Sequence, residues 1–535
     1  MFPGPFTLDA AEAVAGTDAE AAVLRLVDCS LLVPPRTGPD GRSRYSMLET
    51  LRSFGAGRLH QLGEDGQAAA ALAAHASAVA ERAAAQLAVR GQEQPAASWL
   101  DAEDAAVHHG LAWTLDHDPP AGLRLAVSLA PWWLVRGRWA EGYALLQRAV
   151  TQTDSSASNW YTAHLRLGEL SKVVSDFSLV LGHFSTVVDA LREQPPSRDL
   201  VEGLAGRCGA LRNIGRLDEA AEEGHAALKL ARQIRYAAGE ALALLELSHV
   251  SMYAGQPEDA VRWAVQAQRV PDEQIPDPMV RQVKAVLPWA LVVTGRLDGL
   301  TTEQLASLEA QCAQVLELAR SADDPAAQAD THYLLEMLAM KTGRLSAAGA
   351  SLRASAALAA QIGFTLRLID LLDEAGHLCA ASGHPAEAIT LWSAMVAQNE
   401  TAGLADTLEA EHRRESPLRG AEQMLGEGQV SVAKGRGAAM TLAAAAEFAV
   451  MMTEQVKENA PASAPAPAAV AGSGLLSARE RELIALVAQG RTDAEIGEKL
   501  FISVRTVRTH LDRIRDKSGC RRRADLTRLA RSAAR

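Results

Sequence analysis

The sequence predicts a mainly α-helical protein, in which an α-solenoid follows a small helix-and-hairpin module and precedes a compact helical domain. Three observations predict this fold class. Aromatic residues make up only 4% of the 535 residues while alanine and leucine are abundant, a composition that favours helix-on-helix packing. A glycine-containing turn recurs along the centre of the chain, and the last sixty residues contain closely spaced helix caps. The length exceeds what one core supports, so we expect several domains.

Residues 1–62 have the pattern of a small winged helix. Helices are predicted over 7–15, 19–28 and 49–62, and the last of these should turn Leu51, Phe54, Leu59 and Leu62 inward. Extended runs at 31–33 and 44–47 flank a turn rich in proline and glycine, which predicts a hairpin.

The runs 2–8, 26–32 and 44–51 resemble the winged-helix segment that follows the nucleotide-binding domain of STAND-type signalling ATPases. That resemblance implies an ATPase before the segment. No G-x-x-x-x-G-K-[ST] phosphate loop occurs in the chain, so ATP binding is not carried over. Two explanations stay open: a relative that lacks the ATPase, or a gene model that begins at an internal start codon.

Residues 63–436 are predicted to form a helical repeat array. Glycine-containing turns occur at Gly137, Gly215, Gly255, Gly295, Gly343 and Gly383. From Gly215 onward the spacings are 40, 40, 48 and 40 residues, and Gly137 lies 78 residues before Gly215. Each glycine should end one helix in the left-handed conformation, and the acidic residues after it should begin the next. The pattern resembles lengthened tetratricopeptide repeats. An irregular helical bundle is the alternative.

Aromatic residues gather near the front of this array, at Trp132, Trp133, Trp139, Trp160 and Tyr161. They are interpreted either as a pocket for an effector or partner protein, or as packing between repeats. Scattered Asp and Glu residues are interpreted as solvated helix faces. After the array we expect a terminal helix over 437–458 and a linker over 459–474, where proline, alanine and glycine dominate.

No cofactor, metal site or enzyme activity is indicated. The five cysteines lack C-x-x-C spacing. We therefore expect them to be reduced thiols, as is typical of cytoplasmic proteins. His108 and His109 are adjacent and should point apart on a helix, so they are not expected to hold a metal ion. Catalytic motifs such as G-x-S-x-G and H-E-x-x-H are absent. No signal peptide or membrane span is expected, because no run of eighteen apolar residues occurs.

The charge is distributed unevenly along the chain. The net charge is −12, but residues 475–535 hold fifteen Lys and Arg against eight Asp and Glu, a net of +7. The remainder, with 38 basic and 57 acidic residues, carries −19. This asymmetry indicates a basic nucleic-acid-binding domain attached to an acidic body.

Residues 475–535 have the pattern of a helix-turn-helix domain. Ser477 and Glu480 form a capping box, while Thr492 and Ser503 are placed to cap the next two helices. Apolar residues recur at helical spacing and should face inward: Leu483, Ile484, Leu486, Val487, Ile496, Leu500, Val504, Val507, Leu511 and Ile514. The helix after Ser503 would fit the major groove of double-stranded DNA. A basic helical hairpin without a role in DNA binding is the alternative.

The residues expected to contact DNA are polar or charged, and they should be exposed on these helices. They are Thr492, Ser503, Arg505, Thr506, Arg508, Thr509, Asp512, Arg513 and Arg515. Arginines can reach guanine edges or phosphates, and Thr492 and Thr506 can hold phosphates. Asp512 would repel phosphate, so it either accepts from a cytosine amino group or pairs with Arg508 or Arg515.

The runs 476–483, 490–496 and 500–511 resemble the LuxR-type DNA-binding domain. The resemblance implies a four-helix domain whose third helix enters the major groove and whose fourth helix supports dimers. By position, Arg508 and Thr509 match base-reading residues, while Asp512 stands where lysine is frequent. Region 4 of sigma factors shares much of the pattern, but no sigma region 2 precedes it.

Together these patterns resemble large LuxR-type regulators that combine a winged helix, a repeat array and a helix-turn-helix domain. We therefore expect a cytoplasmic, sequence-specific transcription regulator, an activator, with a body that senses an effector or partner protein. A homodimer on DNA is expected, and RNA polymerase is a further candidate partner. The alternative is a tetratricopeptide-type interaction scaffold with a subsidiary DNA-binding domain.

Overall fold

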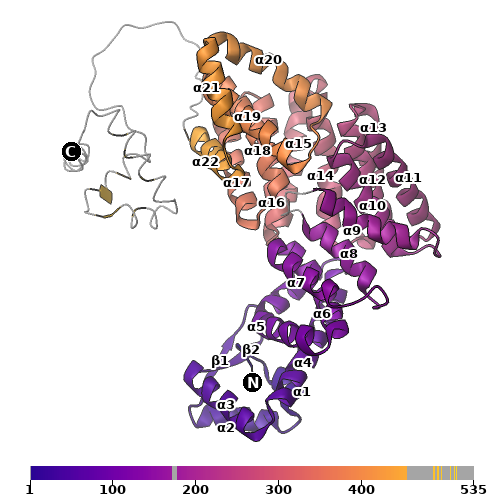
Figure 1. The fold of residues 1–535 in the computed structure, drawn as a ribbon, viewed down its shortest axis with the longest axis vertical. Helices are drawn as coiled ribbons and strands as arrows, with labels where there is room; N and C mark the ends of the chain where they lie inside the picture. Colours follow the sequence, from indigo (N-terminus) through magenta and orange to yellow (C-terminus); the bar gives the residue numbers. More distant parts are fainter. Residues whose placement is uncertain are drawn as a thin grey trace. The chain divides into compact units, whose positions relative to one another are not determined.

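The computed structural model describes residues 2–171 and 177–454, together with Leu483, Leu486, Val487, Arg491, Thr492, Ile496, Val507, Leu511 and Ile514. The chain divides into two compact units, residues 1–458 and residues 459–535, and each is treated by itself. The mainly helical fold class is confirmed, because a long succession of helices makes up the first unit (Figure 1).

The N-terminal module, residues 2–62, has the predicted elements. They are α1 Leu8–Ala15, α2 Ala19–Asp28, β1 Leu32–Thr37, β2 Ser43–Met47 and α3 Glu49–Leu62. The strands pair antiparallel, with Leu32 opposite Met47, and the register shifts between Val33 and Arg36. Pro34 and Pro35 occupy that shift, because proline has no N–H to donate to the ladder. The hairpin prediction is therefore confirmed.

The inward face predicted for the helix over 49–62 is wrong. Phe54 is 75% exposed and Leu62 is 53% exposed, and α3 contains no buried residue. Leu51 and Leu59 are only half-buried. The physical reason is that the core of the module forms from α1, α2 and the hairpin, and α3 lies outside it.

Within residues 63–171 and 177–454, nineteen further α-helices form the helical body, whose course Figure 1 shows. They are α4 Asp65–Leu87, α5 Glu93–His117, α6 Pro119–Val135, α7 Trp139–Thr151, α8 Trp160–Leu170, α9 Phe177–Leu191, α10 Arg198–Asn213, α11 Leu217–Gln233, α12 Ala237–Tyr253, α13 Pro257–Ala267, α14 Asp277–Val293, α15 Thr302–Ser321, α16 Pro325–Lys341, α17 Leu345–Ile362, α18 Thr365–Ala381, α19 Pro385–Ala402, α20 Leu408–Met424, α21 Glu427–Ala438 and α22 Leu442–Thr453. Successive helices pack against each other as in an α-solenoid. Within the described ranges, no helix is long and apolar enough to cross a membrane.

The recurrent glycine turns have the predicted conformation. All six predicted glycines have a positive φ, between 64° and 79°. At Gly215, for example, the next amide, of Arg216, donates to the carbonyl of Leu211 at 2.9 Å, which closes the end of α10. The turn at Gly295 differs, because a 3-10 segment, Arg296–Gly299, follows it before α15 begins. This insertion accounts for the longer spacing of 48 residues to the next glycine.

The aromatic cluster at the front of the array is mostly core. Trp132 and Trp133 are fully buried and Trp139 is 1% exposed, so the packing interpretation is confirmed for these three residues. Trp139 meets Phe364 with ring centroids 5.0 Å apart. The contact joins α7 to the segment before α18, so repeats far apart in sequence lie side by side.

Polar contacts also join the front of the body to its middle. The Arg136 guanidinium donates to the carbonyl of Ala322 at 2.7 Å, and the Gly91 amide donates to Asp277 at 2.8 Å. Arg281 on α14 bonds Glu93 on α5 at 2.6 Å. These long-range contacts hold the solenoid in a curve, which encloses the space inside it.

The terminal helix predicted over 437–458 is wrong in its bounds. Helix α21 ends at Ala438, and α22 begins at Leu442 after the Thr441 hydroxyl accepts from the Ala444 amide. The cap satisfies an amide that a continuous helix would bond to its own backbone, so two helices form in place of one. Residues 455–458 and the predicted linker, 459–474, lie outside the described residues.

Candidate DNA-binding segment and central cavity

The described residues of the C-terminal segment, 475–535, form a buried apolar set. Seven apolar side chains are 0–4% exposed: Leu483, Leu486, Val487, Ile496, Val507, Leu511 and Ile514. All seven are helical, and each was predicted to face inward. Val507, Leu511 and Ile514 are spaced by four and three residues, so they share one helical face. This apolar face is what a small helical domain needs as its core.

Thr492 occupies the position predicted for a helix cap. Its side chain is exposed, and its carbonyl accepts from the Ile496 amide at 2.9 Å, which is a first bond of helical spacing. Just before it, the Arg491 amide donates to the carbonyl of Leu486 at 3.3 Å, a bond typical of a helix end. The other residues predicted to contact DNA lie outside the described residues. They are Ser503, Arg505, Thr506, Arg508, Thr509, Asp512, Arg513 and Arg515.

A large cavity of about 1020 Å³ lies inside the helical body, and we call it the central cavity. Its lining comes from helices across the whole array, from α4 to α20. One part is apolar and aromatic, including Trp139, Trp289, Tyr333, Phe364 and Met395. The volume is at the upper end of the usual range for ligand sites.

Paired charges line another part of the central cavity. Arg367 on α18 bonds Asp330 and Asp370, at 2.9 Å each. Arg414 on α20 bonds Asp373 at 2.8 Å and also pairs with Asp406. These pairs tie α16, α18 and α20 together around the cavity. The interpretation of scattered Asp and Glu residues as solvated faces is wrong here.

Burial perturbs the pKa values of acidic residues in and next to this charged part of the lining. Burial raises the pKa of Asp370 to about 7, although Arg367 acts in the opposite direction. Glu336 is fully buried behind the lining, and burial together with Glu374 raises its pKa well above the usual range. Burial and the neighbouring Glu374 carboxylate thus favour the protonated form of Glu336, which avoids a second buried charge.

Sequence reasoning missed the lining of the central cavity. A signal was present, because α18 carries Asp370, Asp373 and Glu374 among leucines and an isoleucine. Charged residues on the buried face of a helix are rare unless they are paired or functional. Only tertiary contacts show which of those charges meet.

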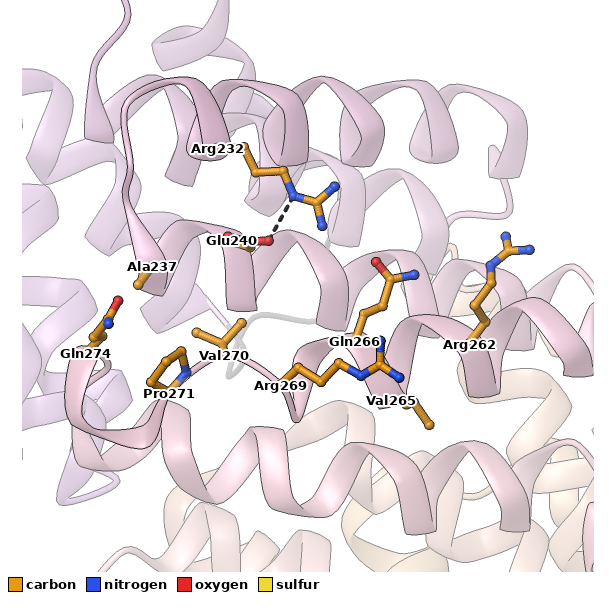
Figure 2. Close-up of a pocket in the computed structure, with 10 residues that line it drawn as sticks. All are labelled: Arg232, Ala237, Glu240, Arg262, Val265, Gln266, Arg269, Val270, Pro271 and Gln274. Atoms are coloured by element: carbon orange, nitrogen blue, oxygen red, sulfur yellow. Dashed lines mark hydrogen bonds and ion pairs between the residues drawn. The ribbon is translucent and has the colours of Figure 1, made fainter.

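A smaller hollow of about 540 Å³ lies between α11, α12 and α13 (Figure 2). Arg232 extends from α11 to Glu240 on α12, with 2.8 Å between the bonded atoms. Arg262 and Arg269 from α13 and the following turn border the same hollow (Figure 2). Arg262 also pairs with Asp259 at 2.8 Å. The side chains of this hollow are largely solvated.

Histidines do not form a metal site in the described part of the chain. His108 lies against Asp104 and Glu141, and the hydrogen bond with Asp104 raises its pKa to about 9. It is therefore a cation at neutral pH, which does not suit a metal ligand. Among the described residues, no group of three or more His, Cys, Asp or Glu side chains is arranged to hold a metal ion.

Comparisons with known proteins agree with the geometry of the C-terminal segment. Residues 474–530 match the family "Bacterial regulatory proteins, luxR family". The transcriptional regulatory protein LiaR of Bacillus subtilis (strain 168) is 50% identical over 42 residues, which are 8% of this chain and 20% of LiaR. The oxygen regulatory protein NreC of Staphylococcus aureus (strain JH9) is 43% identical over 56 residues, or 10% of this chain and 26% of NreC. The chain thus spans about a quarter or less of these relatives.

The helical body has similar solved structures. A Rap protein complexed with Competence and Sporulation Factor covers 58% of this chain and 85% of its own, at 13% identity and a TM-score of 0.45. The Rap conjugation gene regulator of plasmid pLS20, in complex with the Phr* peptide, covers 66% and 98%, at 13% identity and a TM-score of 0.41. Residues 474–530 are a LuxR-family regulatory domain of the DNA-binding, helix-turn-helix kind, attached to a body of solenoid-like helical repeats.

Proposed function

We propose that this chain is a sequence-specific transcriptional regulator, acting as an activator, in which the helical body binds an effector or a partner protein. The observation that carries the proposal is the LuxR-family match over residues 474–530. The burial of all seven described apolar residues supports it, since a folded helical core is required to present a recognition helix. The central cavity supports the effector-binding part.

The DNA contacts follow from the helical spacing around the buried face at Val507, Leu511 and Ile514. From the sequence alone, helical spacing predicts positions 505, 508, 509 and 512 on the faces away from this apolar one. We assign base reading to Arg508 and Thr509, and phosphate contacts to Thr492, Thr506 and the neighbouring arginines. An exposed helix start at Thr492 supports the phosphate role, because backbone amides at a helix N-terminus favour anions.

The experiment is a selection from random double-stranded DNA with the full chain, followed by fluorescence anisotropy on the selected duplex. We expect binding to weaken steeply as salt is raised, because released counterions drive it. Arg508→Ala should relax the selected sequence, whereas Thr492→Ala should weaken binding evenly across sequences. Arg262→Ala, an exposed arginine of the body, is the matched control and should change neither. Absence of any preferred sequence would refute the proposal.

Two partners belong to this proposal. We expect the chain to bind inverted half-sites as a homodimer, because two-fold symmetric sites match two-fold symmetric proteins. Activation would require contact with RNA polymerase. Sedimentation of the chain with and without the selected duplex measures the first, and transcription from a template that carries the selected site measures the second.

A second candidate is an interaction scaffold in which the DNA-binding domain is subsidiary. Exposed apolar side chains at the end of the solenoid favour it, since Met424 is 70% exposed and Val432 is 71% exposed. Removal of residues 459–535 distinguishes the two. A scaffold keeps its cellular effect after this truncation, and a transcriptional regulator loses it.

A further inference from the structure

The central cavity has an acidic bias. Ten carboxylate and six cationic side chains line it, which gives the lining a net charge of −4. Its five arginines are already bonded to carboxylates. They are Arg166 with Glu169 and Glu202, Arg212 with Glu246, Arg367 with Asp330 and Asp370, Arg413 with Asp373 and Glu374, and Arg414 with Asp373 and Asp406. The carboxylates outnumber the cationic side chains, so a cationic ligand can pair with this excess, whereas an anionic ligand would find each arginine already paired.

Polar atoms with few partners mark one end of the cavity. Glu374 is fully buried, and its Oε2 atom has no hydrogen-bond partner among the described residues other than the Glu336 carboxyl, which forms a side-chain hydrogen bond with Glu374. His377, one turn along α18, is 8% exposed, and its Nε2 atom has no hydrogen-bond partner among the described residues. Both side chains line the cavity. Buried polar atoms with few partners are costly, so this end of the cavity favours a ligand that donates hydrogen bonds.

The aromatic wall already holds one cation of the protein itself, Arg367. The Arg367 guanidinium lies 4.2 Å from the ring centroid of Tyr333 and 4.8 Å from that of Trp289. Those two rings stack with their centroids 5.5 Å apart. Aromatic faces attract cationic nitrogen in this arrangement. One end of the cavity thus combines excess carboxylates with aromatic surface, and apolar side chains such as Met337 and Met395 continue the lining.

We propose that the central cavity binds an apolar molecule carrying a cationic nitrogen group, an amine or a guanidinium. The cation lies at the acidic pole, which we define as Asp370, Asp373 and Glu374, and the apolar part lies along Trp289 and Phe364. The inference names the ligand class of the effector-binding body and rests on the proposed function only for the regulatory consequence. Ligand binding itself can be measured without DNA.

The acidic pole also predicts how binding depends on pH. A cation stabilises the ionised form of Asp370, whose pKa is about 7 in the empty cavity. Binding therefore releases a proton, and affinity should increase as the pH rises from about 6 to about 8. The groups that face Asp370 are Arg367 and Asp373 on α18, Asp330 and Tyr333 on α16, Tyr253 on α12, and Asp406 before α20.

The test is a fluorescence titration of the full chain with three dansyl probes of matched length. Dansylcadaverine carries an amine, dansyl-6-aminohexanoate a carboxylate, and dansyl hexylamide no charge. We expect the amine to bind at least about tenfold more tightly than the carboxylate, since a charge-assisted hydrogen bond is lost and a repulsion is gained. Equal binding of the three probes, tighter binding of the carboxylate, or no binding would overturn the proposal.

Variants locate the probe in the cavity. Asp370→Asn should weaken binding of the amine about tenfold and remove the pH dependence, because shape is kept and the charge is lost. Glu374→Gln should also weaken binding of the amine. This variant provides a second test if Asp370→Asn folds poorly. Asp272→Asn, a carboxylate outside the cavity that pairs with Lys284, is the control and should leave binding unchanged. Equal effects of Asp272→Asn and Asp370→Asn would contradict the location.

A competition assay tests the apolar part. Spermidine carries amines without an apolar body, so it should not displace dansylcadaverine at an equal concentration. Displacement at an equal concentration would contradict the requirement for the apolar wall. Since no arm contains DNA, failure of this proposal is distinguishable from failure of DNA binding.

Discussion

Ile514→Ala provides the sharpest test of the link between the C-terminal core and DNA binding. Ile514 is fully buried and shares a helical face with Val507 and Leu511. Truncation of a fully buried isoleucine to alanine costs about 2–5 kcal/mol. In a domain of this size each kcal/mol lowers the melting temperature by about 4–8 °C. A loss of about 3 kcal/mol therefore lowers the temperature at which DNA binding is lost by about 12–24 °C.

The assay is fluorescence anisotropy of the full chain on its selected duplex, recorded as the temperature is raised. Ile389→Ala is the matched control, because Ile389 is equally buried but lies in α19 of the helical body. It should destabilise the body and leave the loss of DNA binding at its original temperature. An unchanged temperature for Ile514→Ala would refute the reasoning. So would an equal decrease for both variants, which would mean that the two units melt together.

Two further predictions concern buried and half-buried charges of the body. Arg281→Met leaves the buried carboxylates of Glu93 and Asp324 without their shared cation, so local opening around α14 should become about 3–5 kcal/mol easier by hydrogen exchange. Arg296→Met removes the solvent-exposed ion pair with Glu258, so opening should become easier by at most about 1 kcal/mol. Equal losses of hydrogen-exchange protection in the two variants would contradict this prediction. The raised pKa of His108, about 9, should stabilise the body fully below about pH 6.5 and lose that contribution as the pH rises towards about 9. His108→Gln should flatten the melting temperature over this interval, and an unaltered pH profile would rule the contribution out.

The repeat turns could be predicted from sequence because each is a local structure. A glycine with positive φ needs only its own backbone and the preceding helix, so Gly215 and its equivalents are visible as a periodic pattern. The apolar set of the C-terminal segment is local in the same way. Val507, Leu511 and Ile514 follow helical spacing, and the structure buries all three.

The inward face of α3 could not be predicted from the same reasoning. Helical spacing identifies which residues share a face, but it does not say that another element covers that face. Phe54 and Leu62 have the spacing of a core stripe and are nevertheless exposed. Whether another element covers a helix face depends on tertiary contacts. The sequence pattern of one helix carries no information about those contacts.

The central cavity illustrates the same limit over a longer range. Arg166 on α8 and Arg414 on α20 both line this cavity, although almost 250 residues separate them in the sequence. Neither residue is unusual in its own helix, because arginine beside glutamate is common on solvated faces. Only the curvature of the solenoid, held by contacts such as that between Arg281 and Glu93, turns these faces inward.

The energetic cost of the acidic pole argues that it serves more than the stability of the fold. Removing charges from water costs about as much as their attraction returns, and apolar replacements of buried ion pairs are often neutral or stabilising. A solenoid selected for stability alone would fill α18 with apolar side chains at positions 373 and 374. This chain places an aspartate and a glutamate there, and both are at most 6% exposed. A cationic ligand offsets the excess of carboxylates in the lining, so its binding should raise the melting temperature of the body, and the increase should disappear in Glu374→Gln.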